Sequence, residues 1–166
     1  MLLRLVPQDF FVLLKSITIP SKIGHKSNWG QTHGAASALA IAETAQSHPG
    51  PILALVKDTD AALKLSAELT FFLTDTGLDC LMLPDWEILP YDSFSAHPDI
   101  VSERISTLNQ ITHLSKGVVI VPVATLLHRL PPMNYLAGNS FTLTTGQELP
   151  QTQFRQRLDQ AGYLLT

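Results

Sequence analysis

Val118-Val119-Ile120-Val121, written VVIV, is the stretch that decides the fold. All four residues are apolar and β-branched, a composition typical of a β-strand. The run does not alternate between apolar and polar residues, which predicts a strand covered on both of its faces. Strands of this kind are typical of a parallel sheet that lies between layers of helices.

Two further apolar runs, at 52–56 and 79–83, predict strands that join this one. The sequence between them predicts helices at 34–47, from the cap Asp58 to about 74, from Pro98 onward and over 123–130. This alternation predicts an α/β domain, a parallel sheet flanked by helices with right-handed crossovers. The predicted inward stripes are Ala61, Leu65, Leu69 and Phe72 in the second helix, and Val101, Ile105 and Leu108 in the third.

Composition and the predicted elements divide the chain into three parts. Residues 1–33 predict a short helix at 7–17 and an irregular segment; a signal peptide fits poorly because charges interrupt the apolar start. Residues 34–137 form the α/β domain. Residues 138–166 predict one strand at 140–145 and one helix at 150–161, which together are too little to bury a core. We therefore expect the beginning of a second, small α+β domain in a piece of a longer protein.

Composition and charge narrow the functional classes. The chain has 166 residues, 45% of them hydrophobic and 15% charged, and its net charge is −3. Residues 58–104 carry ten acids against Lys64 and Arg104. Tight binding of nucleic acid needs clustered Lys and Arg, so a DNA-binding module is a weak alternative. No run of eighteen apolar residues is present, which argues against a membrane span.

Cysteine and histidine usage argues against redox and metal chemistry. Cys80 is the single cysteine, so the chain cannot form an internal disulfide, and we expect a buried thiol in a reducing cytoplasm. The six histidines show no paired spacing that would favour a metal site.

A stretch before the first helix of the domain, GQTHGAAS at 30–37, resembles a phosphate-binding loop in outline. The working pattern is G-x-x-x-x-G-K-[ST], in which glycines let backbone amides wrap the phosphates and the lysine meets their charge. Gly30 and Ser37 fit this frame, whereas Ala35 stands in place of the second glycine and Ala36 in place of the lysine. A vestigial loop, a helix start that matches by chance and a nucleotide-binding enzyme domain all remain open on these residues, and we expect no bound nucleotide.

The stretch LPDWEILPYDSFSAHPDIVSER at 83–104 packs three aromatic residues between three prolines. Those prolines exclude a continuous helix or an inner strand, so the sequence predicts an ordered loop. Ser93, His97 and either Asp92 or Asp99 lie close enough in sequence to suggest a nucleophilic site. Residues so close on a loop rarely form a triad, and turn and capping hydrogen bonds are the better interpretation.

This loop resembles the N-terminal part of one family, the bacterial transcription-repair coupling factors (Mfd). The family pattern is D-W-E-x-L-P-Y-D-x-F-S-P-H, and Ala96 replaces its proline here. The matching residues are Asp85, Trp86, Glu87, Leu89, Pro90, Tyr91, Asp92, Phe94, Ser95 and His97. GVVIVPVATLLHRLPP at 117–132 is also similar, and the resemblance covers roughly residues 34–165.

The resemblance implies a UvrB-like, helicase-like domain whose phosphate loop is degenerate, and a module without catalysis or cofactor of its own. UvrB carries a DNA-gripping hairpin after the matching segment. Here Phe94 leads directly into the next predicted helix, which leaves no room for that hairpin. For the whole protein, the family implies an ATP- and Mg-dependent translocase in other domains that displaces stalled RNA polymerase from DNA. It also implies recruitment of UvrA through the second domain. Independently of the resemblance, Arg155 and Arg157 lie on the outer side of the last predicted helix, where they form either a solvated face or, because arginine is common at interfaces, a protein interface.

Overall fold

The computed structural model describes residues 19–20, 22–30, 32–88, 93, 95–139, 143 and 145–160. The chain divides into two compact units, Met1–His128 and Arg129–Thr166, and each is described by itself. The sequence predicted this boundary after residue 137. The predicted helix at 7–17 lies outside the described residues.

The described residues of unit 1 form a three-stranded parallel sheet in the order β1-β3-β2, so the last of these three strands in the sequence is central. The strands are β1 (Pro51–Val56), β2 (Asp79–Met82) and β3 (Gly117–Pro122). All six residues of β3 are buried, which confirms the prediction made from VVIV. The apolar run at 52–56 predicted a buried strand, but β1 lies at the edge of the described sheet, where Leu53 and Leu55 are 55% and 51% exposed.

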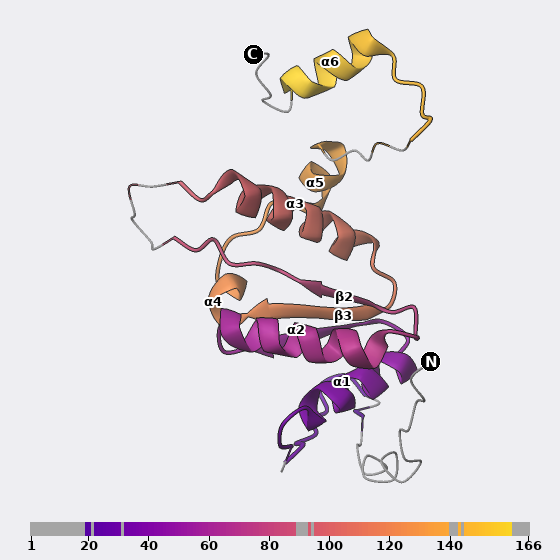
Figure 1. The fold of residues 1–166 in the computed structure, drawn as a ribbon, viewed down its shortest axis with the longest axis vertical. Helices are drawn as coiled ribbons and strands as arrows, with labels where there is room; N and C mark the ends of the chain where they lie inside the picture. The colour runs from indigo at the N-terminus through magenta and orange to yellow at the C-terminus, as the bar shows by residue number, and fades with distance from the viewer. Residues whose placement is uncertain are drawn as a thin grey trace, which may run out of the picture. The chain divides into compact units, whose positions relative to one another are not determined.

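Two helices, α1 (Ala36–Ser47) and α2 (Thr59–Leu73), lie on one side of the strands (Figure 1). α1 is rich in alanine, so α1 and α2 can approach each other and the sheet closely. Asp58 caps α2 as predicted, since its Oδ1 accepts a hydrogen bond of 2.8 Å from the backbone N–H of Ala61. The core between helices and sheet consists of Ala38, Ala42, Ala45, Ala54, Ala62, Leu69, Leu73, Val118 and Ile120.

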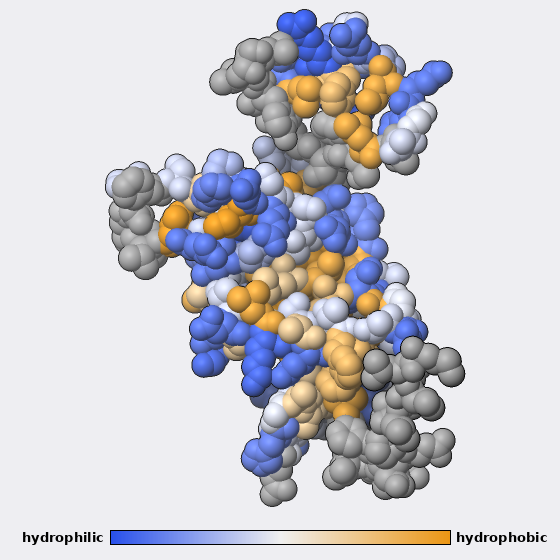
Figure 2. Space-filling view, viewed as in Figure 1, coloured by the Kyte–Doolittle hydropathy of each residue, from blue (hydrophilic) through white to orange (hydrophobic). Residues whose placement is uncertain are grey.

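The third helix, α3 (Pro98–His113), lies on the opposite side of the strands from α1 and packs against β2 (Figure 1). Figure 2 shows hydrophilic residues over the outer sides of α2 and α3, with apolar residues gathered between them. The predicted inward stripe of α3 was partly wrong. Ile105 is 45% exposed, because Arg104, Thr107 and Leu108 take the buried positions.

The remaining helices are shorter: α4 (Val123–Leu126), α5 (Met133–Asn139) and α6 (Gln151–Gln160). α4 is a single turn, so the prediction of a helix over 123–130 was too long, and α5 was not predicted. α6 matches the predicted last helix as far as the described residues reach. Of the strand predicted at 140–145, only Leu143 and Thr145 are described, and neither is in a strand.

Gly117 opens β3 at a point where two backbones approach closely. It pairs with Pro51 on one side and with Asp79 on the other. Its φ is +151°, a value that side chains disfavour, and a Cβ atom built there would lie 2.5 Å from the carbonyl oxygen of Asp79. Glycine is therefore required where the central strand enters the sheet.

Among the described helices, none is both long enough and apolar enough to cross a membrane.

Candidate functional site

The motif loop, defined here as residues 83–88, leaves the sheet where β2 ends. Leu83 is buried, and its backbone N–H donates to the carbonyl oxygen of Ile120 at 3.0 Å, which carries the pairing of β2 with β3 one residue further. The loop thus begins at the carboxyl edge of a parallel sheet, the edge at which α/β proteins usually place their binding sites.

The side chain of Arg104 in α3 contacts this loop. Its side chain is only 2% exposed, its Nη1 donates to the carbonyl oxygen of Pro84, and its guanidinium lies 4.2 Å from the centre of the Trp86 ring. Burial lowers the pKa of Arg104, and the nearby charge of Asp85 opposes that shift. A guanidinium stays protonated under all ordinary conditions, so Arg104 is a buried cation that stacks on an aromatic ring and binds a carbonyl.

Asp85 connects the loop to the end of α4. Its Oδ1 accepts a hydrogen bond of 2.8 Å from the backbone N–H of Trp86 and lies 3.6 Å from Nδ1 of His128. The two side chains of this pair are 27% and 35% exposed, so solvent screens them only partly. Asp85 therefore lies near two basic side chains: that of Arg104 in α3, and that of His128, which follows α4.

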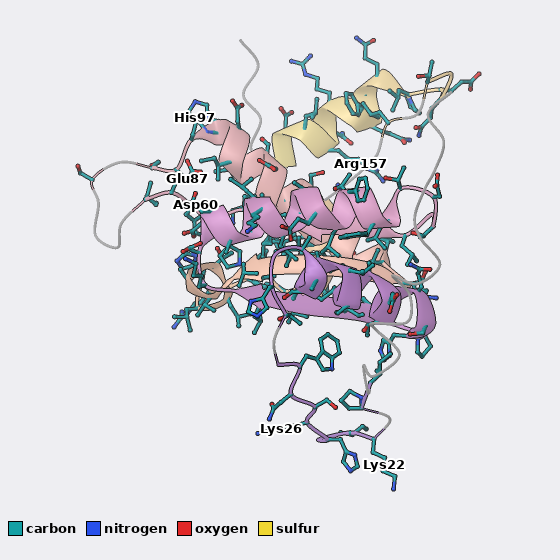
Figure 3. The ribbon with its side chains drawn as sticks, turned by 60° about the horizontal axis from the view of Figure 1, so that its bottom comes forward. Lys22, Lys26, Asp60, Glu87, His97 and Arg157 are labelled. Carbon is teal, nitrogen blue, oxygen red and sulfur yellow. The ribbon has the colours of Figure 1, made fainter. Side chains whose placement is uncertain are left out.

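Glu87 marks the outward turn of the loop. Its φ is +56°, a left-handed conformation uncommon for a residue other than glycine. Figure 3 shows Glu87 and His97 at the same end of unit 1, where β2 ends and α3 begins. Trp86 is thus held against Arg104 while Glu87 is exposed. Five other motif residues lie outside the described residues: Leu89, Pro90, Tyr91, Asp92 and Phe94.

His97 acts as the cap of α3. Its Nδ1 accepts a hydrogen bond of 3.3 Å from the backbone N–H of Asp99 and lies 3.4 Å from Oδ2 of the same residue. Both ring contacts made through Nδ1 are therefore local to the start of the helix. This arrangement agrees with the capping interpretation rather than with a triad that includes Ser93, while Asp92 is outside the described residues.

The candidate phosphate loop is an exposed turn followed by the start of α1. Gly34 has a φ of +59°, Ala35 occupies the cap position without a side-chain hydrogen bond, and Ala36 is the first helical residue. A phosphate loop joins a strand to a helix, and the described residues before α1 contain no strand. Ser37 lies in the first turn, and no basic side chain stands at position 36. The degenerate P-loop interpretation stays a prediction.

Arg155 and Arg157 lie on α6 in unit 2, and both are exposed. Phe154 and Leu158 of the same helix are partly buried. Within the described part of the chain, no three His, Cys, Asp or Glu side chains are placed to hold a metal ion. Burial raises the pKa of the Cys80 thiol, which keeps it in its unreactive form.

The residues that organise the motif loop, Arg104 and His128, were missed by sequence reasoning. A signal for Arg104 was present: it lies three residues after Val101 and four before Leu108, on the face that a helix turns inward. A basic residue in such a stripe, next to an aromatic loop, indicates a buried cation with a ring and carbonyls as partners. Nothing in the sequence pairs His128 with Asp85, since 43 positions separate them.

Comparison with known proteins identifies relatives under one name. The transcription-repair-coupling factor of Escherichia coli (strain K12) is 43% identical over 146 residues, which is 88% of this chain and 12% of that protein. That of Haemophilus influenzae is 34% identical over 145 residues, 87% of this chain and 12% of that protein. That of Bacillus subtilis is 25% identical over 130 residues. No protein-family model matches the chain.

The chain therefore spans about an eighth of the length of these curated relatives. The family resemblance drawn from the motif loop is confirmed, and the alignments extend well beyond the loop into the α/β unit.

Proposed function

This chain is homologous to a segment of the transcription-repair-coupling factors, and on that premise we propose that it is a non-catalytic scaffold and recruitment module of such a factor. The observation that supports the family assignment best is the 43% identity over 146 residues. In this proposal the α/β unit is a rigid support, and unit 2 contributes to the surface that binds UvrA in the cytoplasm. Translocation on DNA, ATP hydrolysis and displacement of RNA polymerase belong to other parts of the longer protein.

The arrangement of side chains supports a scaffold. The buried charge of Arg104 is used within the molecule, on Pro84 and Trp86, and His97 is used to cap a helix. These groups are held by neighbours rather than directed at a reacting atom, so their contribution is to shape and rigidity. A rigid, preformed surface loses less entropy when a partner binds, which suits a recruitment module.

Binding of UvrA tests this function. We expect the full chain, immobilised through a terminal tag, to bind purified UvrA in surface plasmon resonance. Substitution of both Arg155→Glu and Arg157→Glu should weaken binding by about tenfold, because two exposed cations at an interface become anions. Lys22→Glu together with Lys26→Glu, an equal change of charge at two exposed positions of unit 1, is the matched control and should leave the dissociation constant unchanged.

Failure of the unaltered chain to bind UvrA would contradict recruitment through this module. Equal weakening by the α6 variant and by the variant of Lys22 and Lys26 would show that the effect is one of net charge, and would remove the two arginines from the proposed interface.

The alternative function is a nucleotide-dependent enzyme domain, and a thermal shift separates the two. A ligand at 100 times its dissociation constant stabilises a protein by about 2.7 kcal/mol, which raises the melting temperature by several degrees. We expect ATP with magnesium to leave the melting temperature unchanged, since Ala36 supplies no charge to the phosphates. A clear rise in the melting temperature would support the enzyme and contradict the vestigial phosphate loop.

A further inference from the structure

His128 is the last residue of unit 1. α4 ends two residues earlier, and the backbone N–H of His128 donates to the carbonyl oxygen of Thr125 at 3.2 Å, which completes the turn. After His128 the chain continues through Arg129 and Leu130 to two prolines and the start of α5. His128 is therefore the residue at which the backbone leaves unit 1.

The side chain of His128 lies next to the carboxylate of Asp85. Its Nδ1 is buried, makes no hydrogen bond within the described residues, and lies 3.6 Å from Oδ1 of Asp85. A buried ring nitrogen without a partner is costly, so the approach of this nitrogen to the carboxylate is favoured whenever Nδ1 carries a proton.

Asp85 is itself fixed by the motif loop. Its Oδ1 accepts from the N–H of Trp86, and the ring of Trp86 is stacked on Arg104, which also binds the carbonyl of Pro84. A continuous set of contacts thus runs from α3 through the loop to His128. All members of this set belong to unit 1.

We propose that the Asp85–His128 pair is a latch that ties the exit of the backbone from unit 1 to the conformation of the motif loop. With the latch closed, the segment from Arg129 is held at its first residue. The prolines at 131 and 132 extend the restraint because their φ angles are fixed. A partner that moves the motif loop would release Asp85 and free the exit segment. This inference goes beyond recruitment, and it requires no partner to be tested.

Trypsin supplies a direct readout because Arg129 follows the latch and is exposed. Cleavage after Arg129, followed by mass spectrometry of the full chain, reports opening of the exit segment. Cleavage after Arg104, which is 2% exposed, reports unfolding of unit 1 in the same sample. We expect His128→Ala and Asp85→Asn each to raise cleavage after Arg129 about fivefold, the effect of losing one partly screened polar contact. Cleavage after Arg104 should not change.

The double variant and a matched histidine provide the controls. Because both substitutions open one latch, the double variant should be cut no faster than either single variant. His113→Ala, the same chemical change at the far end of α3, should leave cleavage after Arg129 unchanged. The proposal is overturned if the single variants are cut at the unaltered rate, if their effects multiply, or if cleavage after Arg104 rises in parallel. None of these results bears on UvrA binding, so the two proposals fail separately.

Discussion

Replacement of Gly117 by alanine is expected to destabilise unit 1 by about 3 kcal/mol. The new Cβ would lie 2.5 Å from the carbonyl oxygen of Asp79, at a φ of +151°. That oxygen belongs to the backbone of β2, so it cannot rotate away, and the two parallel strands must move apart to relieve the overlap. Urea unfolding followed by far-UV circular dichroism measures the loss as a lower midpoint.

Gly77→Ala is the matched control for this substitution. Gly77 also has a positive φ, +68°, but a Cβ atom there would meet nothing within 4 Å. We expect a loss of about 1 kcal/mol, the cost of the left-handed backbone alone. If the two alanine variants lose the same stability, the close approach of β2 and β3 at Gly117 does not govern the cost.

Arg104→Ala is the second substitution with a large expected effect, a loss of about 2–3 kcal/mol. It removes the hydrogen bond to Pro84 and the contact with the Trp86 ring, and it leaves Asp85 without its buried neighbouring cation. The urea midpoint should fall, and the fluorescence of Trp86 should shift to longer wavelength as water reaches its ring.

Two variants separate the roles of charge and shape at position 104. Arg104→Lys retains the charge but lacks the flat, forked guanidinium, so we expect an intermediate loss. Arg155→Ala removes an exposed arginine from α6 and should change stability by less than about 0.5 kcal/mol. A lysine variant as stable as the unaltered chain would show that the stacking on Trp86 adds nothing beyond charge.

The sequence predicted the regular part of unit 1 because local signals agreed there. The β-branched run of β3, the cap Asp58 and the proline that opens α3 each favoured the element that the structure contains. The order of strands was not predictable, since pairing between distant residues leaves no trace in the periodicity of one strand. Ile105 was placed inward because apolar residues usually face the core, whereas Arg104 takes that position to reach the motif loop.

The sequence singled out the motif loop but not the contacts that hold it. Aromatic residues placed among prolines predicted the loop, and its motif, which includes Trp86, Glu87 and His97, suggested a family that the relatives confirm. The contacts that shape the loop come from α3 and from beyond α4, which only the folded chain brings together. α5 was not predicted, because the prolines at 131 and 132 indicate the end of the preceding helix. Proline also favours the first turn of a helix, and α5 begins directly after these two residues.

The strand order β1-β3-β2 has a consequence for synthesis on the ribosome. β1 and β2 are made first, but neither pairs with the other, and each must wait for β3. The nascent chain therefore carries two unpaired apolar strands until Pro122 has emerged, a period in which chaperones can bind them. The sheet can form only after its central strand has been made.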